Sequence, residues 1–275
     1  MEVLDFIKME GAGNDFIVFS DIENKYSDLS SLAIKLCDRN FGVGGDGILV
    51  ARGCEEADIE MIIINADGSY ASMCGNGIRC FARFVYENGL VKHKKFNVLT
   101  GDGIKVCNLI FNNDEFVGVK INMGYGNFKP DSIPAISQDE VIQKNIKVNN
   151  KNYIINSIHL GVPHTVIHTE GDKFNINEGA SIERYELFPE GTNVNFCRIV
   201  NRDEINVDTW ERGAGPTLAC GTGCCASVVI SNRLGLVGKK VKVVAPGGTL
   251  YIEIEDSGVM MTGPAKNVFN GSIRL

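Results

Sequence analysis

The chain has 275 residues, of which 44% are hydrophobic and 22% charged, so it can bury a sizeable core and is not expected to be disordered. Its 34 acidic against 27 basic side chains give a net charge of −7, which argues against a nucleic-acid-binding face. No apolar run reaches the roughly 18 residues of a membrane helix, and acids stand near the start where a signal peptide would carry basic residues. We therefore expect a soluble, cytoplasmic protein with no membrane partner.

The elements of the first half are clearest after Cys74. The motif Cys-Gly-x-Gly at residues 74–77 predicts a flexible loop, and residues 78–88 predict a helix of about three turns that ends before a glycine suited to the C′ position. A strand is expected at 96–99, followed by a turn at 100–103 and a further strand from 104.

A polar stretch at residues 125–134 is the predicted linker to a second half with the same succession of elements. That half is predicted to contain a loop at 220–223, a helix at 224–234, a strand at 241–244, a turn at 246–249 and a strand at 250–254.

An internal repeat connects these two successions. Residues 65–101 align with 211–247 at a constant offset of 146, without a gap and with 9 identities in 37 positions, where chance would give about 2 or 3. The identities include the glycines of both loops and the pair formed by Cys74 and Cys220. The repeat predicts two homologous α+β halves, although a coincidence of two glycine-rich loops is the alternative.

Nine cysteines are present, and an odd number without a signal sequence argues against a disulfide framework. Cys37, Cys107 and Cys197 stand among apolar neighbours and are expected to be buried hydrophobes. Cys220 and Cys224 have a spacing that zinc can use, but a zinc site also needs a second pair of cysteines or histidines. The sequence offers no such second pair, so no metal site is expected.

Each half therefore places one cysteine just before a helix, where the helix dipole and free N–H groups favour a thiolate and can bind a carboxylate. Two such units would put a thiolate and a thiol on opposite faces of one carbon, which suits inversion of a stereocentre by paired acid–base groups. Glu211 and Arg212 stand side by side in a glycine-rich turn and could recognise an ammonium and a carboxylate, or form an ordinary surface ion pair.

The chain resembles the diaminopimelate epimerase family along its whole length. The resemblance is carried by these segments: KMEGAGNDF at 8–16, DRNFGVGGDG at 38–47, NADGS at 65–69, MCGNGIRC at 73–80, GVPH at 161–164, EGTNVN at 190–195, ERGAG at 211–215, ACGTG at 219–223 and MTGPA at 261–265. It implies two pseudo-symmetric halves, 1–122 and 123–265, each a curved, mostly antiparallel sheet around a central helix. Residues 266–275 would return to the first half, and the active site would occupy the cleft between the halves.

The resemblance also implies an activity and its residues. The family converts LL-2,6-diaminopimelate to the meso form without pyridoxal phosphate or metal, serves lysine and peptidoglycan synthesis, and has many homodimeric members. Cys74 would take the proton from the L centre and Cys220 would deliver one to the other face, while His164 and Glu211 tune the thiol pKa values. The substrate-binding positions implied are Asn14, Asn65, Gly75, Asn76, Asn193, Glu211, Arg212, Gly221 and Thr222.

Some residues depart from the family pattern. Val162 stands where the family often has Asn, Glu10 where it often has His, and Pro216 where it often has Glu. The run at 42–47 contains a weak Gly-x-Gly-x-x-Gly nucleotide signature without a clear preceding strand, so a turn near the active site is expected instead.

Two other readings remain open from the sequence. One is another cofactor-independent amino-acid epimerase of the same architecture. The other is a non-catalytic thiol or metal-sensing module built on Cys220, Cys224 and Cys225.

Overall fold

The computed structural model describes residues 3–171 and 174–275. The chain divides into two compact units: unit 1 runs to Ile121 and includes Thr262–Leu275, and unit 2 comprises Asn122–Met261. Within the described residues, no helix is both long enough and apolar enough to cross a membrane.

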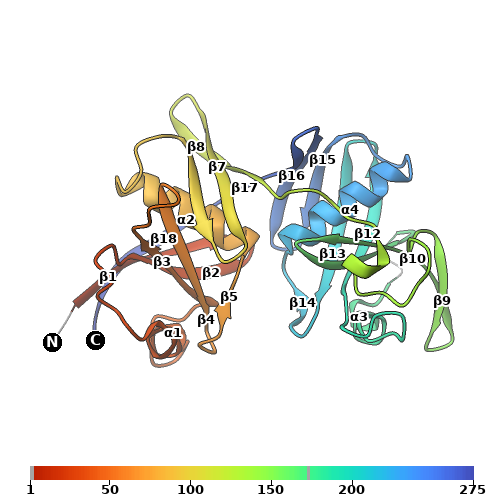
Figure 1. Cartoon of the computed structure of the whole chain (residues 1–275), viewed down its shortest axis with the longest axis horizontal. Helices are drawn as coiled ribbons and strands as arrows, with labels where there is room; N and C mark the ends of the chain where they lie inside the picture. The colour runs from red at the N-terminus through yellow and green to blue at the C-terminus, as the bar shows by residue number, and fades with distance from the viewer. Residues whose placement is uncertain (1–2, 172–173) are drawn as a thin grey trace. The chain divides into compact units, whose positions relative to one another are not determined.

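Unit 1 consists of a sheet and two helices (Figure 1). Its elements are β1 (Val3–Gly11), β2 (Asn14–Ser20), α1 (Leu29–Cys37), β3 (Gly47–Arg52), β4 (Ile59–Asn65), β5 (Tyr70–Ala71), α2 (Gly75–Glu87), β6 (Lys95–Thr100), β7 (Gly103–Asn112), β8 (Glu115–Asn122) and β18 (Lys266–Arg274).

Unit 2 contains a similar succession. Its elements are the 3-10 turn η1 (Pro130–Ser132), β9 (Lys144–Val148), β10 (Lys151–Leu160), β11 (Val162–His168), the 3-10 turn η2 (Ile176–Glu178), α3 (Gly179–Glu183), β12 (Asn193–Asn201), β13 (Glu204–Glu211), β14 (Gly215–Thr217), α4 (Gly221–Arg233), β15 (Lys240–Ala245), β16 (Gly248–Glu255) and β17 (Gly258–Gly263), which ends in unit 1.

The strands of the two units pair in the same order and sense. In unit 1, β1–β2 is antiparallel, β2–β3 parallel, β3–β4 antiparallel, β4–β6 parallel and β6–β7 antiparallel. Unit 2 repeats that alternation with the pairs β10–β11, β11–β12, β12–β13, β13–β15 and β15–β16. Each parallel step needs a crossover, which a helix supplies in every case. The prediction of two homologous α+β halves is confirmed.

The central helices α2 and α4 each have 13 residues, and nine of the 13 are buried in each. A helix that is buried on nearly all sides forms the middle of its unit rather than a surface layer. Both helices begin three residues before their predicted starts, at Gly75 and Gly221, so the prediction of a flexible Cys-Gly-x-Gly loop is wrong. Each cysteine is itself the N-cap, and the glycines that follow form the first helical turn.

The opposite face of each sheet is covered by a shorter helix. In unit 1, α1 buries Leu29, Ala33 and Leu36 against Phe19 and Ile48 of β2 and β3. In unit 2, Ile182 of α3 belongs to a cluster with strand residues such as Ile167 and Phe196. The sheets are therefore buried on both faces, which holds their edges and turns in fixed positions around the central helices.

The last strand, β18, pairs antiparallel with β1, from Val3 opposite Arg274 to Glu10 opposite Lys266. The stretch predicted as a linker, residues 125–134, belongs to unit 2: Asn127 exchanges backbone hydrogen bonds with His159, and Ile133 is buried.

Candidate active site

Cys74 lies at the start of the central helix of unit 1. Its Sγ accepts a hydrogen bond from the N–H of Gly77 at 3.3 Å, as the side-chain oxygen of an N-cap residue does. Cys74 is partly exposed, so its sulfur combines access with a donor that favours negative charge. Gly75 and Asn76 supply the first N–H groups of the same helix.

Three amide and guanidinium groups form a chain of hydrogen bonds beside this helix start, each group donating to the next. Buried Arg79 donates from Nη2 to Asn76 Oδ1 (2.9 Å), Asn76 Nδ2 donates to Asn14 Oδ1 (2.7 Å), and Asn14 Nδ2 donates to Asp46 Oδ2 (2.8 Å). Arg39 pairs with the other oxygen of Asp46. These hydrogen bonds fix the orientation of both asparagines, and they place the turn at 42–47 next to Asn14, a predicted site residue.

Asn65 stands apart from this chain. It ends strand β4 opposite Gly47, and its Nδ2 donates to Ser69 Oγ at 2.9 Å. A Cβ on Gly47 would come 2.6 Å from the carbonyl oxygen of Ile64, so the backbone of this turn packs closely on β4. Asn65 therefore lies next to the turn that ends in Asp46 and Gly47, without a bond to Asn14 among those described.

Cys220 has a different environment from Cys74. It is 7% exposed, and its Sγ lies 3.4 Å from Thr222 Oγ1. Burial, and then the negative charge of Glu211, raise the pKa of the Cys220 thiol, while Thr222 and the N–H of Gly223 oppose the rise. Burial also raises the pKa of Glu211, whose carboxylate accepts hydrogen bonds from Thr217 and Cys220. The helix dipole alone would favour a thiolate here, but burial outweighs it and Cys220 is held as a thiol.

Asn193 and Arg212 are joined through the backbone of neighbouring segments. Asn193 Nδ2 donates to the carbonyl of Pro163 (2.9 Å), and its Oδ1 accepts from the N–H of Arg212 (2.9 Å). The guanidinium of Arg212 donates to the carbonyl of Glu190 at 2.9 Å. Arg212 therefore does not use its guanidinium on Glu211, and the predicted side-by-side carboxylate and guanidinium have separate partners.

His164 is fully buried in β11, next to Asn195 of β12. Gly221 and Thr222 form the first turn of α4, and a Cβ on Gly161 would lie 3.4 Å from Thr222 Cγ2, so the loop before β11 packs on that helix start. Val162 begins β11 and is 37% exposed.

The family model described as diaminopimelate epimerase matches residues 6–129 and 156–268. The diaminopimelate epimerase of Clostridium perfringens is 55% identical over 270 residues, which cover 98% of this chain and 99% of that protein. The one of Caldanaerobacter subterraneus is 44% identical over 274 residues, with 98% and 99% covered. The chain belongs to the diaminopimelate epimerase family. It is therefore an enzyme of the isomerase class, which excludes the reading as a non-catalytic thiol module.

Solved structures agree with the fold seen in this member of the family. A phenazine biosynthesis protein of the PhzF family from Bacillus anthracis is 15% identical, with a TM-score of 0.72 and all of both chains covered. A probable proline racemase from Agrobacterium radiobacter is also 15% identical, with a TM-score of 0.68 and 99% and 93% covered. At this identity they show a shared fold.

Sequence reasoning missed three polar residues of this epimerase-family chain: Arg79, Asp46 and Asn195. Arg79 stands three residues after Asn76, so the two share a helix face. Asn195 stands two residues after Asn193 on a strand and so shares its face. Both spacings were available as signals, whereas Asp46 required knowledge of the turn.

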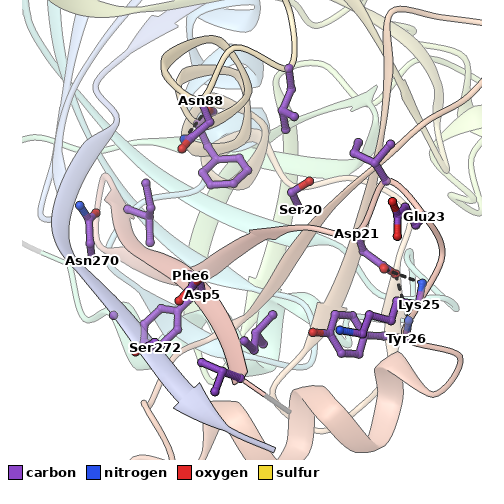
Figure 2. Close-up of a pocket in the computed structure, with 17 residues that line it drawn as sticks. Asp5, Phe6, Ser20, Asp21, Glu23, Lys25, Tyr26, Asn88, Asn270 and Ser272 are labelled. Carbon is purple, nitrogen blue, oxygen red and sulfur yellow. Dashed lines mark hydrogen bonds between the residues drawn. The ribbon is translucent and has the colours of Figure 1, made fainter.

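A separate pocket of about 910 Å³ lies in unit 1 and includes none of the predicted site residues (Figure 2). Strands β1 and β18, the chain after β2 and the end of α2 line it. Asp21 there accepts hydrogen bonds from the backbone of Lys25 and Tyr26 and from Arg52.

Proposed function

We propose that the protein converts LL-2,6-diaminopimelate to meso-diaminopimelate, with Cys74 and Cys220 as the two acid–base groups and without pyridoxal phosphate or a metal. The observation that carries the proposal is the repeated helix start: the same position in each unit holds a cysteine at the N-cap of a buried 13-residue helix. Relatives that bear the name diaminopimelate epimerase cover nearly the whole chain and support the substrate.

The different surroundings of the two thiols support a division of roles. Cys74, partly exposed and bonded to the Gly77 N–H, is the thiolate that removes the α-proton of the L centre. Cys220, whose pKa is raised by burial and by Glu211, is the thiol that delivers a proton to the opposite face. The electron pair left by the first proton forms the new C–H bond, and Cys220 ends as the thiolate. The roles exchange for the reverse reaction.

The helix starts supply what the carbanion-like state needs. The N–H groups of Gly75 and Asn76, and those of Gly221 and Thr222, are oriented donors at positive helix ends, suited to hold the reacting carboxylate and spread its charge. We further propose that Asn14, Asn65, Asn193, Glu211 and Arg212 bind the ammonium groups and the distal carboxylate. Pre-formed bonds, such as those of Asn14 and Asn193, would hold these groups in place before substrate arrives.

The same proposal places the reaction in lysine and peptidoglycan precursor synthesis, in the cytoplasm, with the protein as a homodimer. Strand β18 supports the dimer because it exposes Val268 and Phe269 by 57% and 47% on a strand that pairs with β1. Two exposed apolar side chains of this kind on a strand offer a contact for a second copy. Sedimentation of the purified protein at several concentrations tests this part.

Single-cysteine variants test the two-thiol assignment. Cys74→Ser and Cys220→Ser should each lower epimerisation of LL-diaminopimelate by orders of magnitude, since a hydroxyl is a far weaker acid than a thiol and a far poorer base near neutral pH. Elimination from a β-halogenated diaminopimelate should survive in the single variant that keeps the cysteine facing the α-hydrogen, because it needs one base. Cys54→Ser, at a half-buried cysteine outside the site, is the matched control and should keep the wild-type rate.

Near-normal epimerisation by either site variant would overturn the assignment. A wild-type protein that ignores diaminopimelate but inverts another amino acid would favour the alternative of a different epimerase of this fold. Val162 would then be the first position to exchange for Asn, because its side chain offers the substrate no hydrogen bond.

A further inference from the structure

A buried polar network surrounds His164 in unit 2. The network comes from three neighbouring strands, β11, β12 and β13, and its members are at most 3% exposed: His164, Thr165, Asn195 and Thr209. Asn195 and Thr209 are direct cross-strand partners. Thr209 Oγ1 donates to Asn195 Oδ1 at 3.0 Å, which anchors one end of the amide.

The other end of the Asn195 amide determines where the proton of His164 resides. Asn195 Nδ2 lies 3.3 Å from the backbone carbonyl of Thr165 and 3.2 Å from His164 Nδ1. A carbonyl oxygen can only accept, so the amide atom facing it must be the NH₂ group. That group also faces Nδ1, which must then be the acceptor. A neutral His164 therefore carries its proton on Nε2.

The Nε2–H group has no hydrogen-bond partner among residues 3–171 and 174–275. Leaving such a donor buried and unpaired is unfavourable, and the cost is usually accepted where function requires it. Burial, with smaller electrostatic contributions from His159 and Arg212, lowers the pKa of His164 to about 3, so the ring is neutral near pH 7. The Nε2–H group of His164 is thus an oriented, uncharged hydrogen-bond donor without an acceptor among the described residues.

We propose that Asn195 is a positioning residue that holds His164 in the Nε2–H tautomer, so that the imidazole acts as a neutral hydrogen-bond donor to an anion of the reaction rather than as a base. The anion is a thiolate sulfur or a carboxylate oxygen. This inference rests on the proposed function and deepens it, because it says which nitrogen of His164 tunes the chemistry and what fixes it.

Asn195 also contacts the helix that Cys220 caps. A Cβ on Gly223, in the first turn of α4, would come 2.2 Å from Asn195 Oδ1, so the helix start packs directly on this amide. One side chain therefore fixes the tautomer of His164 and supports the turn that carries the Cys220 thiol.

The test is the ¹⁵N NMR spectrum of the histidine rings. The chain has only four histidines, and His164→Gln identifies the resonance that belongs to this ring. The wild-type protein should show His164 as the neutral Nε2–H tautomer from pH 5 to 9. Asn195→Asp, whose carboxylate only accepts, should draw the proton to Nδ1, and Asn195→Leu, which keeps the shape without hydrogen bonds, should leave a mixture of tautomers. Turnover should fall about 10- to 1,000-fold in both variants.

Ser157→Ala is the matched control. Ser157 lies in the same network through Thr165 Oγ1, at 2.9 Å, whereas the bond to His164 Nδ1 comes from Asn195, so the tautomer should not change. A wild-type ring that is protonated on Nδ1 or charged at pH 7 would overturn the inference, even if the variants do not fold. An unchanged tautomer in folded Asn195→Leu would also overturn it. Because the spectra need no substrate, failure here is distinguishable from failure of the proposed function.

Discussion

Gly77 and Gly223 occupy the same position in the two halves of the repeat, yet a methyl group added at Gly223 should destabilise the protein far more than one added at Gly77. In Gly77→Ala the new Cβ would meet Cys74 Cβ and Leu49 Cδ2 at 3.3 Å, a contact that small side-chain shifts relieve. In Gly223→Ala it would meet Asn195 Oδ1 at 2.2 Å, inside a fully buried network. The pair therefore separates a generic helix effect from a specific clash.

The expected free energies follow from these contacts. Both substitutions gain up to about 1 kcal/mol from replacing a helical glycine. Gly223→Ala also overpacks the core, at about 1–3 kcal/mol, and displaces a buried amide from its partners, at about 1–3 kcal/mol. We expect Gly77→Ala to stay within about 1 kcal/mol of the wild type, and Gly223→Ala to lose about 1–5 kcal/mol.

Urea unfolding measures both values. The single tryptophan, Trp210, lies in unit 2 and donates to Glu183, so its fluorescence follows the unit that carries Gly223. Far-ultraviolet circular dichroism follows the whole chain and so includes unit 1. Equal stability of the two variants would refute the claim that Asn195 is packed rigidly between His164 and the start of α4.

Three further predictions concern individual groups. Burial holds the pKa of His164 at about 3, below its unfolded value of 6.5. The unfolded chain therefore takes up the extra proton as the pH falls, and the folded protein loses stability from pH 6.5 downward. His164→Gln should remove about 3 kcal/mol of the loss between pH 6.5 and 4, measured by urea unfolding. Arg79→Met should destabilise by about 2–4 kcal/mol and raise KM, because Asn76 loses its donor. Arg83→Met on the same helix should cost less and leave KM unchanged, because Arg83 is partly exposed and bonds to Glu87 and to the carbonyl of Ala265 instead of to Asn76. Glu211→Gln should lower the pKa of Cys220 by removing a neighbouring charge, seen as faster alkylation of the Cys220 peptide at a given pH.

The repeat was the most informative feature of the sequence. A constant offset of 146 between Cys74 and Cys220 predicted two similar halves, and the central helices do begin at residues that differ by that number, Gly75 and Gly221. The helix starts were placed three residues late because two glycines in four positions are typical of a loop. The pattern does not reveal that a cysteine side chain caps the helix and lets glycines form its first turn.

The polar contacts of the site could not be predicted in the same way. The bond between Asn195 and His164 depends on the parallel register of β11 and β12, which joins residues 31 apart in sequence. The raised pKa of Cys220 depends on burial, which opposes the helix-end effect that the motif alone suggests. Motifs thus supplied the candidate residues, whereas their charge and tautomer depend on the packing around them.

Proton exchange during the first turnovers tests the central claim most directly. The reduced protein is incubated with LL-diaminopimelate in D2O, and the product and the recovered substrate are examined by NMR at low conversion. Two thiols predict deuterium at the inverted centre of meso-diaminopimelate, since Cys220 delivers a solvent-derived proton, while the recovered LL substrate keeps its own hydrogen. Product that retains the substrate's hydrogen at the inverted centre would show that one group moves the proton between faces, and would contradict the account.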